Sequence, residues 1–122
     1  MNVTDPLLEA HHIIPWGKSD NILVQRAASA SNKPFHINHG GNGIEATKFR
    51  LDTNTGQHAN HPAYDVLVER DLTAQWNQLV NIFGGAANVP TSAARDALIN
   101  VQNNIRNVIA NNPTIKINDL IW

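Results

Sequence analysis

The apolar residues between positions 60 and 84 recur at the period of an α-helix. They form a stripe made of Val68, Leu72, Trp76, Leu79 and Phe83. Residues spaced by three and four positions share one helix face, so this face should be buried. Pro62 suits a first helical turn, where its missing N–H costs nothing, and Gly84-Gly85 predicts the end of the helix. The sequence therefore predicts a long helix from near residue 60 to residue 83.

Two polar residues continue this stripe towards its N-terminus. Asp65 lies three positions before Val68, and His61 lies four positions before Asp65. Side chains four apart on a helix have Cβ atoms about 6 Å apart, which suits two ligands of one cation. The alternative is that the pair belongs only to the helix start, where the macrodipole favours an acidic residue such as Asp65.

A second stretch, Glu9 to Pro15, carries two adjacent histidines followed by two isoleucines. The β-branched pair favours an extended backbone, so a strand is predicted here. Neighbouring side chains of a strand point to opposite faces, so His11 and His12 should diverge. One ring could then bind a cation while the other reaches a water molecule. Alternatively, both are partly exposed strand histidines without a function.

The absence of cysteine limits the chemistry that these residues can perform. It excludes disulfides, cysteine-based zinc sites and thiol catalysis. His11, His61 and Asp65 would give a cation three protein ligands and leave positions open for water and substrate, as in catalytic metal sites. His12, with an ordinary pKa near ~6.5, could then act as a general base at neutral pH.

The 122 residues suit one domain, and their formal net charge is −1. Such a balance argues against a tight sequence-specific nucleic-acid binder, and less against an enzyme that makes few phosphate contacts around a cation. No apolar run approaches the ~20 residues of a membrane span, and no secretory signal is visible. Because the histidine strand comes so early, we expect a domain cut from a longer protein.

Other segments complete the predicted order of elements. We expect a short helix over 21–30, capped by Asp20 or Asn21, and a turn over 39–43 followed by a strand over 44–49. A last helix should span 92–110, capped by Thr91 or Ser92, and a short strand should span 114–117.

Three motifs in this order resemble the AHH nuclease family of the HNH/endonuclease VII superfamily. They are AHHIIP (10–15), NGI (42–44) and HANHPAYD (58–65), and the resemblance covers roughly residues 9–75. It implies an α+β fold with a ββα-metal (HNH/endonuclease VII-like) core, in a single nuclease domain spanning residues 1–122. The helix and short strand of about 91–122 would be a C-terminal elaboration outside the motifs.

Carried over by motif, the resemblance makes His11 a metal ligand and His12 the general base. His61 and Asp65 would be the helix ligands, although the family often has asparagine at the place of Asp65. Asn42 would hold the hairpin connection and keep His12 oriented. From the residues alone, Asn42 is equally a tight-turn residue.

Three further residues receive weaker assignments. His58 occupies a place where the family tends to have a polar or basic residue, which suggests a role at the scissile phosphate. Lys48 and Arg50 are basic residues near the motifs, and either could neutralise a neighbouring phosphate.

The implied function is metal-dependent hydrolysis of phosphodiester bonds in DNA, with one divalent ion (Mg²⁺, Mn²⁺, Ni²⁺ or Zn²⁺). Family members are often toxin domains at the C-termini of bacterial polymorphic toxins or secretion-system effectors. A cognate immunity protein and action in the cytoplasm of a target cell would follow. The alternatives are a non-catalytic, metal-stapled interaction module and a ribonuclease on the same core. A zinc deaminase is disfavoured by the missing cysteines, and a metalloprotease by the missing HExxH run.

Overall fold

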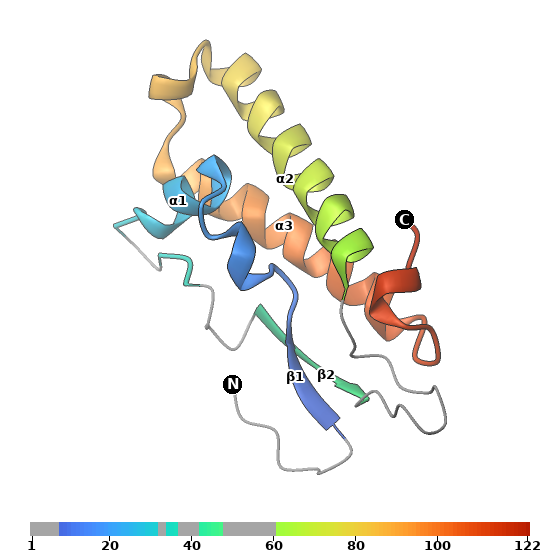
Figure 1. The fold of residues 1–122 in the computed structure, drawn as a ribbon. Helices are drawn as coiled ribbons and strands as arrows, with labels where there is room; N and C mark the ends of the chain where they lie inside the picture. Colours follow the sequence, from blue (N-terminus) through green and yellow to red (C-terminus); the bar gives the residue numbers. More distant parts are fainter. Residues whose placement is uncertain (1–7, 32–33, 37–41, 48–60) are drawn as a thin grey trace.

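Two strands and three helices make up the regular structure of the described part of the chain (Figure 1). The structure is a computed structural model that describes residues 8–31, 34–36, 42–47 and 61–122. The regular elements are β1 (Leu8–His12), α1 (Ile22–Ala28), β2 (Gly43–Thr47), α2 (Pro62–Phe83) and α3 (Thr91–Ala110). Short 3-10 turns lie at Trp16–Lys18, Ala86–Asn88 and Ile117–Asp119.

The two strands pair antiparallel, with His11 opposite Ile44 and His12 opposite Gly43. β1 ends at His12, and the chain then turns into the core, where Ile13 and Ile14 are fully buried. The strands predicted at the histidines and over 44–49 are therefore confirmed within the described residues. Residues 39–41 of the predicted turn and 48–49 of the predicted strand lie outside them. β1 is shorter than the predicted 9–15 stretch, because the isoleucines leave the sheet and pack among the helices.

Helix α2 confirms the long helix predicted from the apolar stripe. It begins at Pro62 with His61 as its N-cap, and it ends at Gly84, whose φ of 76° is in the left-handed region that glycine adopts easily. Its buried face carries Tyr64, Val68, Leu72 and Trp76. The predicted burial of Phe83 is wrong, since 38% of this residue is exposed in the last turn, where the chain leaves the helix.

Helices α1 and α3 pack closely against each other, and α3 also packs against α2. In Figure 1, α3 runs back along α2 after the turn that joins them. The Asn21 side chain caps α1 by accepting a hydrogen bond from the N–H of Leu23 at 2.9 Å, as predicted. α3 starts one residue earlier than predicted, with Pro90 as its N-cap in place of Thr91 or Ser92.

The strand predicted over residues 114–117 is wrong. This segment runs through turns into the 3-10 turn Ile117–Asp119, and Ile117 is fully buried in the core. A strand needs a neighbour for its backbone hydrogen bonds, and within the described residues β1 and β2 pair with one another. The mixture of a small sheet and helices is compatible with an α+β nuclease, while a ββα arrangement around a metal stays a prediction. None of the described helices is both long and apolar enough to span a membrane.

Candidate active site

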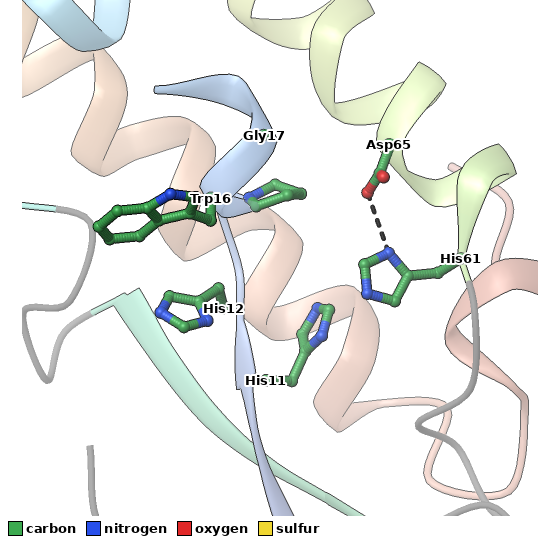
Figure 2. A pocket seen from close by; sticks show the side chains of 7 residues that line it. His11, His12, Trp16, Gly17, His61 and Asp65 are labelled. Carbon is green, nitrogen blue, oxygen red and sulfur yellow. Dashed lines mark hydrogen bonds and ion pairs between the residues drawn. The ribbon is translucent and has the colours of Figure 1, made fainter. Parts of the chain in front are cut away.

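A cavity of about 300 Å³ lies between the end of β1 and the beginning of α2. The turn that follows β1 also lines this cavity, through Pro15, Trp16 and Gly17. Figure 2 shows the side chains that line it, which are His11, His12, Pro15, Trp16, Gly17, His61 and Asp65. Four of the six residues predicted to be catalytic or metal-binding, namely His11, His12, His61 and Asp65, therefore meet at one cavity.

The tandem histidines diverge as the strand prediction requires. The His11 side chain is 99% buried and its ring lies edge-on to the His61 ring, with centroids 5.1 Å apart at 86°. His12 is half-buried, and in Figure 2 it lies across the β1 ribbon from His11, beside Trp16. One ring thus faces the start of α2, and the other lies on the side of Trp16 (Figure 2).

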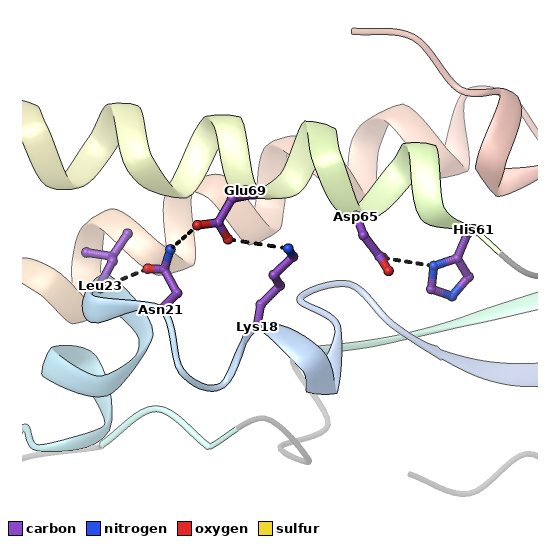
Figure 3. Close-up of polar contacts among 6 residues, drawn as sticks. All are labelled: Lys18, Asn21, Leu23, His61, Asp65 and Glu69. Atoms are coloured by element: carbon purple, nitrogen blue, oxygen red, sulfur yellow. Dashed lines mark hydrogen bonds and ion pairs between the residues drawn. The ribbon is translucent and has the colours of Figure 1, made fainter.

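His61 and Asp65 contact each other directly at the start of α2. Nδ1 of His61 lies 2.9 Å from Oδ1 of Asp65 (Figure 3). An ionised carboxylate only accepts hydrogen bonds, so Nδ1 is the donor in this contact, and in the neutral imidazole Nε2 then keeps its lone pair. A carboxylate contact of this kind orients an imidazole for ligation through its other nitrogen.

The donor set fits a divalent cation in its chemistry. Two imidazoles and one carboxylate are ligands that zinc and other transition metals accept, and His11, His61 and Asp65 all line the cavity. In the part of the chain that the structure describes, however, no three His, Asp or Glu side chains form a group that could hold an ion as they stand. The hydrogen bond to His61 occupies Oδ1 of Asp65, one of the two carboxylate oxygens that could bind the ion.

Tyr64 is a site residue that the sequence analysis missed. Its ring is fully buried and lies edge-on to His11 and to His61, with centroid distances of 5.0 and 5.4 Å. Its hydroxyl donates a hydrogen bond to the carbonyl of Ile13. Burial raises the pKa of Tyr64 well above its ordinary value, and the negative charge of Asp65 raises it further. The signal was present, because Tyr64 precedes Val68 by four positions on the apolar stripe.

Trp122, which received no role from the sequence, supports Tyr64 from its other side. The two ring centroids are 5.6 Å apart, and the indole Nε1–H of Trp122 donates to Oδ2 of Asp71 at 2.6 Å. Asp71 belongs to α2, so Trp122 ties the end of the sequence to the helix that carries His61.

Asn42 holds the chain where it leaves β1. Its side chain is fully buried; Oδ1 accepts from the N–H of Ile14 at 2.8 Å, and Nδ2 donates to the Ile14 carbonyl at 3.0 Å. Its own carbonyl accepts from the N–H of Ile13 at 2.8 Å. These bonds fix the residues that directly follow His12. That they orient His12 for catalysis stays a prediction.

Two residues of helix α3 contact Asn42 and Gly43. Nε2 of Gln102 lies 3.4 Å from Oδ1 of Asn42, and Nη1 of Arg106 donates to the Gly43 carbonyl at 2.9 Å. The two residues are four apart and share one face of α3. No local sequence pattern indicates these contacts, because they join residues about 60 positions apart.

A polar network fixes the turn after β1 to α2 (Figure 3). Oε1 of Glu69 accepts from Nδ2 of Asn21 at 3.1 Å, and Oε2 lies 3.5 Å from Nζ of Lys18. Glu69 follows Asp65 by four positions on α2. The network therefore continues the line of side chains that begins with His61 and Asp65.

His58, Lys48 and Arg50 lie outside the described residues. The roles predicted for them at the scissile phosphate and at a neighbouring phosphate stay predictions.

Comparison with known protein families gives one match. The matching family is described as AHH, a nuclease family of the HNH/ENDO VII superfamily with conserved AHH, and its model aligns with residues 2–83. Those residues include the tandem histidines, Asn42 and the whole of α2. No curated protein and no solved structure gave a significant match to the chain.

Proposed function

Because the chain belongs to the AHH nuclease family of the HNH/ENDO VII superfamily, we propose that it is a metal-dependent endonuclease that cuts DNA. Nucleases of this family hydrolyse phosphodiester bonds, and the proposal adds the ion and the substrate. The observation that carries it is the meeting of His11, His12, His61 and Asp65 at one cavity. β1 contributes the buried imidazole of His11 and the half-buried imidazole of His12, and the start of α2 contributes the His61–Asp65 pair. Together they would supply metal ligands and a general base.

In this proposal His11, His61 and Asp65 hold one divalent cation. His61 would bind through Nε2, since Nδ1 faces Asp65. Asp65 would bind directly if its hydrogen bond to His61 is exchanged for the ion, and otherwise it keeps the ring oriented. The bound cation would stabilise the negative charge that develops on the phosphate oxygens during hydrolysis.

His12 is the residue that we assign as general base. It is half-buried, it lines the cavity, and its ring lies apart from the His11–His61 pair (Figure 2). It would take a proton from the water that attacks phosphorus. Asn42 would keep it in place through the hydrogen bonds to Ile13 and Ile14.

We further propose that the domain acts as a toxin in the cytoplasm of a target cell, after delivery by a polymorphic toxin or a secretion-system effector. A nuclease of this kind would kill the cell that makes it, so a cognate immunity protein would be its partner. The support is the family assignment.

The deciding experiment is a plasmid-nicking assay with Mg²⁺, Mn²⁺, Ni²⁺ or Zn²⁺, with and without EDTA, and with RNA offered beside DNA. His12→Ala should lose most of the cleavage, since a general base contributes about 10²- to 10⁴-fold. His36→Ala is the matched control, because His36 is exposed and does not line the cavity.

If His12→Ala cuts as fast as the parent, the base is wrongly assigned. If RNA is cut and DNA is not, the enzyme is a ribonuclease. If chelation unfolds the domain and no ion supports cleavage, the residues form a structural metal staple.

A further inference from the structure

Trp16 is an exposed aromatic residue at a position where the fold does not need one. It is 59% exposed, whereas Trp76 in the core is 8% exposed. Single exposed apolar residues are common on protein surfaces and need no explanation by themselves. What distinguishes Trp16 is its place, because it lies four residues after His12, in the 3-10 turn that follows β1.

The indole ring forms part of the wall of the cavity that holds the histidines. Trp16 and Gly17 line this cavity together with His11 and His12. In Figure 2 the ring lies on the same side of β1 as His12. Apart from its two chain neighbours, no atom lies within 4 Å of the place that a Cβ of Gly17 would take, so the cavity wall is open at this residue. A flat group that entered next to His12 would therefore meet an accessible indole.

Among the residues that the structure describes, the charged side chains near the cavity do not form a basic surface for phosphates. Lys18, the basic residue of the same turn, lies 3.5 Å from the carboxylate of Glu69, and Asp65 adds a negative charge to the cavity wall. Elsewhere among the described residues, Arg70 and Arg95 contact the aspartates that follow them. With a formal net charge of −1, the chain favours a binding mode in which part of the affinity comes from contacts other than those to phosphates.

We propose that Trp16 binds an unpaired nucleobase of the substrate by stacking, next to the phosphate that is cut. Stacking on an aromatic side chain is uncharged and tolerates any base, so it suits a near-neutral protein with loose sequence preference. In a duplex both faces of a base are covered by its neighbours, so the ring is reached only by a single-stranded, frayed or flipped base. This inference rests on the proposed nuclease function and narrows its substrate to nucleic acid with locally unpaired bases.

The test is a titration of the whole chain with single-stranded and fully paired oligonucleotides of the same sequence, with EDTA present so that metal-dependent cleavage does not occur. Trp16→Ala should weaken binding of the single strand about ten- to hundredfold, and Trp16→Phe should keep most of the affinity. Ile22→Ala is the matched control, because Ile22 is 47% exposed but does not line the cavity. Its affinity should equal that of the parent.

Two further measurements separate stacking from other contacts. Abasic sites are moved along the single strand one position at a time, and at one position the difference between parent and Trp16→Ala should disappear. Binding should also quench the tryptophan fluorescence of the parent more than that of Trp16→Phe. Equal affinities of parent and Trp16→Ala, or a loss that no abasic site removes, would overturn the proposal.

The outcome is distinct from that of the nuclease assay. Cleavage without any effect of Trp16→Ala on binding would refute the stacking role alone. Trp16-dependent binding without cleavage under any ion would refute the nuclease activity and leave a nucleic-acid-binding site at Trp16. If neither binding nor cleavage is found, both proposals fail.

Discussion

Replacing Tyr64 with phenylalanine removes a single hydroxyl from the buried side of the site. That hydroxyl donates to the carbonyl of Ile13, and both residues are fully buried. A buried acceptor that loses its donor costs about 1–3 kcal/mol, while the remaining ring keeps the packing with His11 and His61. We therefore expect the free energy of unfolding of Tyr64→Phe at neutral pH to be about 1–2 kcal/mol lower than that of the parent.

The same substitution should change the dependence of stability on pH. Burial and the charge of Asp65 raise the pKa of Tyr64 in the folded protein, whereas the unfolded chain titrates near the ordinary value of about 10. As the pH rises, the unfolded chain therefore loses the tyrosine proton first. The stability due to this group is fully present below about pH 10 and is lost above it, by about 1.4 kcal/mol per pH unit, until the folded pKa is reached.

The assay is simple because Tyr64 is the one tyrosine of the chain. Urea unfolding of parent and Tyr64→Phe between about pH 7 and 11 isolates the slope, since lysines titrate in both proteins. Phenolate absorbance in the folded parent reports the ionisation directly. The reasoning is refuted if the folded and the urea-unfolded parent form phenolate with the same midpoint, or if the two proteins lose stability equally above about pH 10.

Other contacts give smaller tests. Asn42→Ala leaves the N–H and the carbonyl of Ile14 without this partner, so urea unfolding should show a loss of about 2–4 kcal/mol; a loss below about 1 kcal/mol would mean that water replaces the amide. Arg106→Met removes the donor to the Gly43 carbonyl, so the nicking rate should fall at a temperature where the variant is still fully folded. A nicking rate that falls only as the folded fraction falls would argue for a purely structural role. Glu69→Ala should cost less than about 1 kcal/mol, because its ion pair is partly exposed, and a larger loss would contradict that view.

The sequence predicted the elements whose burial follows a local period. Helix α2 could be placed because its apolar residues recur every three or four positions and end at glycine. The strand predicted over 114–117 failed because alternation states which residues could face a core, but not whether a partner strand exists. The burial predicted for Phe83 was wrong for a related reason, since a periodic stripe does not show how far along the helix other residues pack against it.

The candidate site was predictable in its composition and less so in its contacts. The spacing of His61 and Asp65 predicted that they would lie together, and they do. It could not decide whether they would bind a common ion or each other, because both arrangements need the same separation on a helix. The prediction that β1 and the start of α2 lie next to each other likewise rested on the three motifs, and not on any local pattern.

In this chain, residues of α3 contact the motif residues Asn42 and Gly43. The family match ends at residue 83, yet the residues behind Asn42 and Gly43 lie on α3. Gln102 contacts the amide that fixes the exit from β1, and Arg106 holds the strand residue opposite His12. Helix α3, which carries none of the motif residues, thus contacts both Asn42 and the strand residue that pairs with His12. Changes on this face of α3 should alter the geometry of the site while all of the motif residues stay the same.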